Sequence, residues 1–257
     1  MIDKTAERSS IIQDEHEWHD QHAHRRHKLD VLLYRPPASD GVVESALRFL
    51  QGRPGEMVLE VGCGEGKEVV TLASQGLDVV GTDLSQTQLA RARDLALMEA
   101  PTASVCSVQA SAEQLPFADS SFRIVHGKAI LHHLDLDIAS RETRRLLRPG
   151  GLASFSEPLA RHPLFRLARR VTPQLRTGNE RPLTIGELSS FSKVFSSSQQ
   201  ETYFLLSPFA YALRASPNLE GVFRRAYALL SRIDRTLFRR VPMLRRFAWY
   251  GAVRVRK

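Results

Sequence analysis

The sequence predicts an α/β fold built on a mostly parallel, doubly wound sheet. Three features support this prediction: short apolar runs alternate with helical stretches, a glycine-rich loop follows the first apolar run after two N-terminal helical stretches, and proline or glycine separates many of the elements. The chain has 257 residues, 42% hydrophobic and 25% charged, which is enough for one such domain with additions.

The glycine-rich loop is the feature around which the chain is organised. Met57–Val61 is apolar apart from Glu60 and predicts a buried strand, whereas Lys67–Ala73 predicts a helix. Residues 62–66, between them, have the sequence GCGEG. Glycine is needed where the backbone takes a positive φ, or where a ligand approaches with no Cβ in its way. We therefore expect a ligand to lie across the end of the strand, against the start of the helix.

Two acidic residues limit what that ligand can be. Glu60 lies two residues before the first glycine, where it suits a free amine better than an anionic pyrophosphate. A second apolar run, residues 77–81, is followed by Thr82 and Asp83, a carboxylate placed for ribose hydroxyls. The G-x-G-x-x-G spacing of dinucleotide sites would need a third glycine at Lys67, so a nicotinamide-dependent dehydrogenase is disfavoured.

Three further motifs follow the loop in order. Residues 112–122 match A-E-x-L-P-F-x-D-x-S-F, residues 131–134 read LHHL, and residues 147–151 read LRPGG. Together with the loop and Asp83, these motifs resemble the class I S-adenosylmethionine (SAM) dependent methyltransferases, in particular their small-molecule, ubiquinone/menaquinone-methyltransferase-like branch. The resemblance covers about residues 57–157.

The resemblance implies both a more detailed fold and a cofactor. The fold would be a Rossmann-like sheet of seven strands closed by a C-terminal antiparallel hairpin, with N-terminal helices and a basic helical insertion, and the cofactor would be SAM. Ser111 departs from the family pattern, which usually has an aspartate that accepts a hydrogen bond from the adenine amino group. A serine hydroxyl can accept the same hydrogen bond, but it carries no negative charge. The resemblance places these residues at the cofactor: Glu60, Gly62, Cys63, Gly64, Gly66, Asp83, Leu84, Ser111, Ala112, Glu113 and Lys128.

Candidates for substrate contact and catalysis come from several segments. Trp18 and His19 lie in a predicted N-terminal lid helix, and His126 ends the fourth predicted strand. The candidates for catalysis are His132, His133 and Glu157. Histidine accepts protons near neutral pH, but a histidine pair also serves for packing and helix capping, and both alternatives stay open here.

The N-terminal segment is rich in histidine but predicts no metal site. Five of the nine histidines lie within residues 14–34, a stretch without glycine or proline that predicts a helix, ended by Pro36 and Pro37. No cysteine accompanies them, and acids and arginines are interleaved, so a solvated helix or a lid is expected instead of a metal site.

The other predicted elements alternate as a doubly wound sheet requires. Strands are predicted at 57–61, 77–81, 104–109, 122–126, 152–156, 200–206 and 249–255. Helices are predicted at 41–50, 67–73, 86–99, 163–171, 184–191 and 219–240. We expect one compact domain overall, in which residues 1–56 form a lid, residues 57–157 the SAM-binding core, and residues 158–257 the substrate-side helices, the basic insertion and the closing strands.

The two parts of the chain carry opposite charge. Residues 1–157 contain 17 lysines and arginines against 23 acids, whereas residues 158–257 contain 19 against 5. The predicted helix 219–240 places its arginines off one apolar face, formed by Val222, Phe223, Ala226, Leu229, Leu230, Ile233 and Leu237. This layout suits a helix lying in a membrane interface. It also suits a helix packed on the domain with solvated arginines, which is favoured because the segment links two strands that must pair.

Composition limits the location and the function classes. No apolar run approaches the ~18 residues of a membrane span, and residues 1–12 lack a signal-peptide layout. Two cysteines, Cys63 and Cys106, cannot form a disulfide framework, so we expect a cytoplasmic protein, with any peripheral contact at the inner membrane face.

The leading functional prediction is SAM-dependent methyl transfer to oxygen, nitrogen or carbon of a small molecule, such as a secondary metabolite or a lipid-linked or glycosyl compound. One alternative is an RNA methyltransferase that uses the basic part, although RNA surfaces tend to offer exposed aromatic residues and lysines. Another is a SAM-binding module without turnover. The Asn/Asp-Pro-Pro-aromatic signature of DNA and protein amino-methyltransferases is absent after residue 126.

Overall fold

The computed structural model describes residues 10, 13–14, 16–17, 39–171, 181–215 and 217–257. Trp18, His19 and most of the predicted helix 14–34 lie outside the described residues, so their predicted roles stay predictions.

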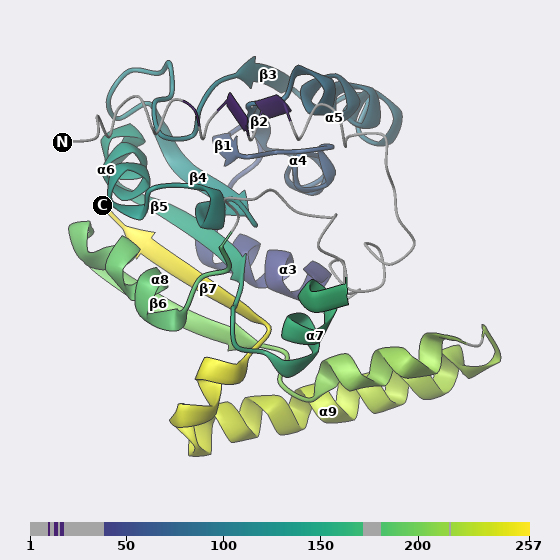
Figure 1. Cartoon of the computed structure of the whole chain (residues 1–257). Helices are drawn as coiled ribbons and strands as arrows, with labels where there is room; N and C mark the ends of the chain where they lie inside the picture. Colours follow the sequence, from purple (N-terminus) through teal and green to yellow (C-terminus); the bar gives the residue numbers. More distant parts are fainter. Residues whose placement is uncertain (1–9, 11–12, 15, 18–38, 172–180, 216) are drawn as a thin grey trace.

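A seven-stranded sheet runs through the described part of the chain in the order β3-β2-β1-β4-β5-β7-β6 (Figure 1). The first five strands are parallel, and β7 is antiparallel to both β5 and β6. The strands are β1 Met57–Val61, β2 Asp78–Asp83, β3 Val105–Gln109, β4 Phe122–Lys128, β5 Leu147–Pro158, β6 Ser197–Tyr203 and β7 Tyr250–Arg256. The predicted doubly wound sheet with a C-terminal antiparallel hairpin is therefore confirmed.

Helices follow most strands, and several begin at caps that the sequence already indicates. The Ser85 hydroxyl accepts from the Gln88 amide, and Thr184 with Glu187 forms a capping box. The α-helices are α3 Ser39–Leu50, α4 Lys67–Ala73, α5 Gln86–Glu99, α6 Leu136–Leu146, α7 Pro163–Val171, α8 Ile185–Phe191 and α9 Glu220–Arg240. The 3-10 segments include η1 Leu131–His133, η4 Ser207–Ala215 and η6 Pro242–Phe247. Helix α6 and the 3-10 segments are not among the predicted elements.

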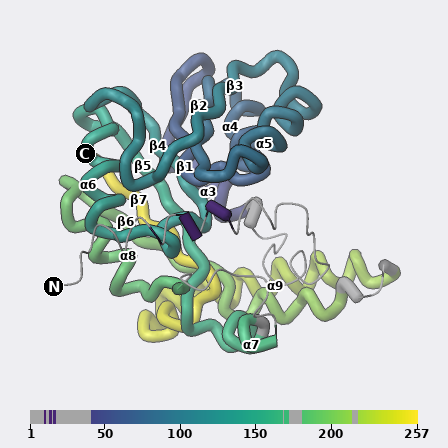
Figure 2. Tube along the Cα trace, turned by 45° about the horizontal axis from the view of Figure 1, so that its top comes forward, coloured from purple at the N-terminus to yellow at the C-terminus, as the bar shows by residue number. Residues whose placement is uncertain are grey.

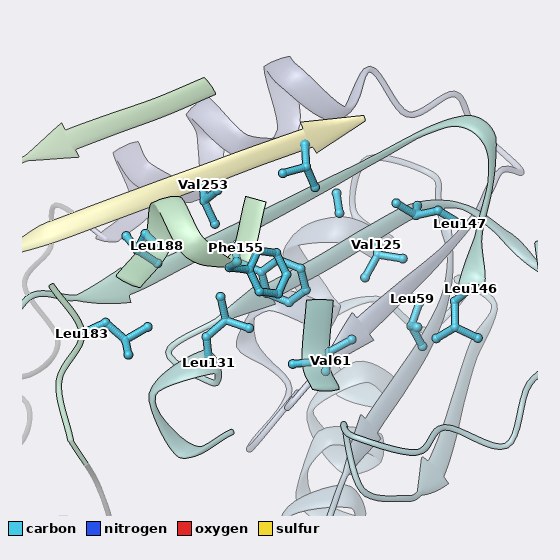
Figure 3. Packing of buried hydrophobic residues seen from close by; sticks show 14 of the residues in the cluster. Leu59, Val61, Val125, Leu131, Leu146, Leu147, Phe155, Leu183, Leu188 and Val253 are labelled. Atoms are coloured by element: carbon cyan, nitrogen blue, oxygen red, sulfur yellow. The ribbon is translucent and has the colours of Figure 1, made fainter. Parts of the chain in front are cut away.

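Alternating residues of the central strands pack on opposite faces of the sheet. Val58 and Ile124 face a cluster formed with α4 and α5, whereas Leu59 and Val125 face the cluster on the side of α6 and α8. Figure 3 shows the second cluster, in which the Phe155 ring lies among side chains of several strands and α8. Both faces are covered, as a parallel sheet requires.

Strand β6 begins and ends three residues before its predicted position. The polar residues Ser197–Gln199 extend the strand because they pair with β7 only, at the edge of the sheet, where a side chain need not be apolar. At the other end, Phe204 takes a φ of 65°, which interrupts the strand before the predicted residues 204–206.

Helix α9 lies at the end of the molecule away from β3 and α5, as both views show (Figures 1 and 2). The predicted apolar face packs on the domain only in part, since Ala226, Leu230 and Leu237 are partly buried. Phe223 and Phe238 are buried with Asp234 between them, whereas Val222, Leu229 and Ile233 are exposed. The reason is that the buried face is centred on Asp234, which the hydrophobic pattern could not include.

Within the described part of the chain, no helix has the length and apolarity needed to cross a bilayer.

Candidate functional site

The glycine loop crosses the carboxyl end of β1 in a conformation that depends on glycine. Gly62, Gly64 and Gly66 have φ values of 68°, 50° and 87°. A Cβ at Gly66 would lie 2.6 Å from the Cα of Ala92 on α5, so the loop and that helix approach as closely as backbone allows. A Cβ at Gly64 would meet nothing within 4 Å, so this glycine borders open space.

Asp83 ties the loop to the end of β2. Its Oδ2 accepts from the Gly64 amide at 2.9 Å, and its Oδ1 accepts from the Ser85 amide at 3.0 Å. A carboxylate offers about four lone-pair positions, so two stay available for further donors such as ribose hydroxyls. The predicted pairing of loop and second acid is thus a direct contact between them.

Cys63, a predicted cofactor residue, turns its side chain into the core. The side chain is 4% exposed, and its Sγ would lie 3.2 Å from a Cβ placed at Gly81. Its amide donates to the Thr82 carbonyl at 2.9 Å. The Cys63 side chain is therefore a packing element that fits the loop onto β2.

Glu60 and His126 form a buried pair beneath the loop. They are direct neighbours in the parallel register of β1 and β4, and Nδ1 of His126 lies 2.6 Å from Oε2 of Glu60. Burial raises the pKa of the Glu60 carboxyl. Burial alone would lower the pKa of His126, but the Glu60 carboxylate raises it above its ordinary value. His126, predicted to contact substrate, is 0% exposed, and the structure places it behind Glu60 instead.

Lys128 contacts an acid that sequence reasoning missed. Its Nζ lies 2.5 Å from Oε1 of Glu68, in the first turn of α4. Burial would raise the pKa of Glu68, but the Lys128 ammonium holds it below its usual range. Glu68 could have been found from the sequence, because it is an acid in the first turn of the helix that follows the glycine loop. Two acids and two basic groups thus meet at the ends of β1 and β4.

Side chains of the predicted adenine-side segment accept hydrogen bonds from backbone amides. The Ser111 hydroxyl accepts from the Glu113 amide at 3.3 Å, and Glu113 Oε1 accepts from the Asp135 amide at 2.6 Å. Ala112 and Leu84 are both partly buried. The glutamate of the motif therefore fastens this loop to the start of α6.

Arg145 of α6 explains the rest of that motif. Its guanidinium donates to the carbonyls of Leu115 and Phe117 and to the carboxylates of Asp119 and Glu142. The side chains of Glu142 and Asp119 raise the pKa of Arg145, which stays charged. Sequence reasoning missed this residue because Leu115, Phe117 and Asp119 lie 26 to 30 residues from it along the chain, although Glu142 is only three residues away.

His132 and Glu157 meet at the ends of β4 and β5. Glu157 is 0% exposed; its Oε1 accepts from the Ile130 and Leu131 amides at 2.9 and 2.8 Å, and its Oε2 lies 2.7 Å from Nδ1 of His132. The rings of His132 and His133 lie 4.2 Å apart. The structure thus brings together all three predicted catalytic candidates.

The residues present fit a nucleoside-bearing amino acid cofactor. Open space at Gly64 leaves room beside the loop, and Asp83 keeps lone pairs directed at the same edge. Lys128 supplies a positive charge for a carboxylate, whereas Glu60 is 1% exposed and bonded to His126, so it lies beneath the loop. Among the described residues, no group of three histidine, cysteine or acidic side chains is arranged to hold a metal ion.

Comparisons with known proteins agree with this geometry. Residues 59–155 match the family model described as a methyltransferase domain. The methyltransferase GfsG of Streptomyces halstedii is 37% identical over 52% of this chain and 49% of its own length. The O-methyltransferase resE of Aspergillus sclerotiorum is 31% identical over 59% of this chain and 64% of its own. The chain thus spans about half to two thirds of the length of these relatives.

A solved structure shares the fold. Phosphoethanolamine N-methyltransferase 2 of Haemonchus contortus, determined in complex with SAM, superposes with a TM-score of 0.61 at 20% identity, over 84% of this chain and 52% of that one. The sheet order, the glycine loop and the sequence matches agree, and residues 59–155 match a methyltransferase domain of the class I, SAM-dependent type.

Proposed function

We propose that this protein transfers a methyl group from SAM to a hydroxyl oxygen of a small molecule. The observation that carries the proposal is the buried pair of His132 and Glu157 beside the glycine loop. Ile130 connects this pair to the glycine loop. Its amide donates to Glu157, and its side chain lies 2.7 Å from the position that a Cβ would occupy at Gly62. The similarity to the O-methyltransferase resE supports the choice of oxygen.

SAM, when bound, supplies a methyl group already activated for in-line displacement, so the chain must position and deprotonate the acceptor. Glu157 accepts a hydrogen bond from Nδ1 of His132, and this tautomer makes Nε2 the proton acceptor. His132 takes the proton that the hydroxyl releases as its oxygen gains the methyl group. Glu157 is a positioning residue, which orients the ring and stabilises its charged form.

The cofactor contacts are part of the same proposal. Asp83 would accept from the ribose hydroxyls, Glu60 and Lys128 would bind the amine and carboxylate of the methionine portion, and the backbone at Gly64 would pass beneath it. Ser111 and Ala112 would flank the adenine, the former through its uncharged hydroxyl.

The reaction is tested by identifying the product. Purified protein, labelled SAM and an extract of the source organism are incubated, and the labelled product is characterised by mass spectrometry and NMR. We expect an O-linked methyl group on a small molecule. A label on nitrogen, carbon or RNA would overturn the acceptor assignment, and calorimetry that finds no SAM binding would overturn the proposal as a whole.

The base is tested by paired histidine variants. His132→Gln should lower kcat about 10²- to 10⁴-fold with SAM affinity unchanged, because only the proton transfer is lost. His133→Gln, on the neighbouring ring, is the matched control and should retain most of the activity. Glu157→Gln should shift the pH at which kcat rises. Full activity of His132→Gln would refute the base.

Location and partners complete the proposal. The two cysteines, Cys63 and Cys106, are both unpaired, which supports the cytoplasm, and the exposed arginines of α9 support a peripheral position at the inner membrane face. An acceptor that meets the enzyme there would be an amphiphile, such as a lipid-linked or polyketide-like molecule. RNA is the second candidate partner, and the labelling experiment above distinguishes it.

A further inference from the structure

Helix α9 presents two parallel ridges on the side that does not pack on the domain. Val222, Leu229 and Ile233 are spaced by seven and four residues, so they form one ridge, and their side chains are 51%, 60% and 37% exposed. We call this the apolar ridge. The residues three positions beyond Val222 and Leu229 are Arg225 and Arg232.

The second ridge is cationic. Arg225, Arg232 and Arg239 are spaced by seven residues, are all exposed, and lie about 60° around the helix from the apolar ridge, given 100° per residue. We call these residues the arginine ridge. Among the described residues, the structure pairs one arginine of α9 with an acid, Arg224 with Glu220 at 3.0 Å, and Arg224 lies outside this ridge.

The inner face of α9 holds the helix on the domain without using either ridge. Phe223 and Tyr227 pack against Tyr211 of η4, with ring centroids 5.4 and 6.1 Å apart. Asp234 is 3% exposed and accepts from the amides of residues 205–207 at 2.8 to 3.1 Å. The apolar ridge is therefore not needed for packing within the domain, and its exposure needs another explanation.

A neighbouring helix repeats the pattern at the same end of the molecule. Phe165 of α7 belongs to a buried cluster against which the partly buried Tyr227 of α9 packs, and Figures 1 and 2 both place α7 beside α9. On α7, Leu167 and Val171 are four residues apart and 57% and 61% exposed, and Arg170 is exposed beside them.

We propose that the apolar and arginine ridges of α9 dock the protein on an anionic lipid bilayer. A bilayer interface offers what the two ridges match, namely acyl chains beside negatively charged headgroups. Nucleic acid could bind the arginine ridge through its phosphates, but it would leave the apolar ridge unused, because that ridge contains no aromatic ring on which a base could stack. A second copy would bring arginines towards arginines, since residues 158–257 carry 19 basic against 5 acidic residues.

The test is flotation of the full chain with vesicles of phosphatidylcholine alone, or with about a third phosphatidylglycerol. We expect binding to the anionic vesicles at low salt and much weaker binding at 1 M salt, where screening acts within about 3 Å. The variant R225Q/R232Q/R239Q should lower the partition coefficient about 100-fold, at roughly fivefold for each arginine. V222S/L229S/I233S should also lower it.

A matched control separates a defined surface from net charge. R93Q/R141Q/R148Q removes three exposed arginines from α5, α6 and β5, and should change the partition only a few-fold. Equal losses in both triple variants, or no binding to anionic vesicles by the wild type, would overturn the proposal. Light scattering that shows a dimer dissociated by V222S/L229S/I233S would instead assign the ridge to a second copy, and RNA that displaces the vesicles would assign the arginines to nucleic acid.

Two measurements keep these outcomes interpretable. Each variant's urea midpoint should match that of the wild type, because the substituted side chains are exposed. SAM affinity should also be unchanged, so failure of vesicle binding and failure of the proposed methyl transfer would be recorded independently.

Discussion

Glu157 and Asp234 are both buried carboxylates that accept from backbone amides, yet they occupy different kinds of region. Asp234 also accepts from the Ser207 hydroxyl, so its four bonds all go to groups that fix the chain. One oxygen of Glu157 accepts from backbone amides, and the other lies at hydrogen-bond distance from an imidazole. The comparison teaches that burial of a carboxylate does not by itself indicate function. The contacts of both carboxylate oxygens are needed to distinguish a structural acid from a candidate functional one.

Asp234→Ala should cause the largest loss, breaking the α9 region while leaving the cofactor end intact. Removal of the carboxylate leaves three backbone amides and a hydroxyl without an acceptor, which should cost about 3–5 kcal/mol of unfolding free energy. Urea unfolding measures it. Glu220→Ala, at a partly exposed acid on the same helix, is the control and should cost under about 1 kcal/mol. If Asp234→Ala lost no more unfolding free energy than Glu220→Ala, the structural role of Asp234 would be contradicted.

Gly66→Ala should give the next largest effect, at the cofactor end. The positive φ and the 2.6 Å approach to the Ala92 backbone together predict a loss of about 2–4 kcal/mol in unfolding free energy. Gly64→Ala, with a positive φ but open space around it, should cost about 1–2 kcal/mol and still weaken SAM binding. Equal destabilisation by both changes would mean that the contact with α5 is unimportant.

Asp83→Ala should weaken SAM binding by about 1–3 kcal/mol, the usual loss for a hydrogen bond to a charged group. Part of the loss would come from the loop, since Asp83 also accepts from the Gly64 amide. Asp83→Asn, which keeps one accepting oxygen, should bind SAM with an affinity between that of Asp83→Ala and that of the wild type. Calorimetry provides the measurement, and unchanged affinity in Asp83→Ala would remove the ribose role.

The smallest expected effect is a pH dependence at the α9 end. His162 is fully buried, its Nε2 lies 3.0 Å from the Leu205 carbonyl, and burial lowers its pKa although nearby Asp234 acts in the opposite direction. Between that lowered pKa and about 6.5, the unfolded chain binds more protons than the folded one, so stability should fall as pH drops below about 6.5. His162→Gln should flatten this part of the stability profile, as urea midpoints from pH 7.5 to 5 would show. An unchanged slope would mean that His162 does not titrate differently on folding.

The sequence predicted the cofactor end closely and the other end only in outline. The bounds of β1, α4 and α5 were predicted to the residue because glycines, a serine cap and a proline mark their ends. Strand β6 was misplaced because its start is polar and is defined by pairing with β7, which local pattern does not reveal.

The candidate site shows the same division. The sequence placed Asp83 and Glu157 at strand ends, where they lie, and it named His132, which lies in η1 after β4. It did not predict that His126 is buried behind Glu60, since that contact arises from the register between β1 and β4. It also missed Glu68, Asp234 and the contacts of Arg145 with residues 115–119, because these partners lie far apart along the chain. Long-range partners of charged groups need the fold before they can be assigned.

The position of β7 between β5 and β6 has a consequence for how the enzyme matures. Glu157 lies opposite Gly251 in the β5–β7 ladder, so its strand acquires its second neighbour only after α9 and η6 have been synthesised. Such pairings between distant segments close late, because the loop entropy must be overcome first. A nascent chain that has already formed the glycine loop would still carry Glu157 on an open sheet edge. Competence for proton transfer should therefore appear in a single late folding step, separable in time from competence for cofactor binding.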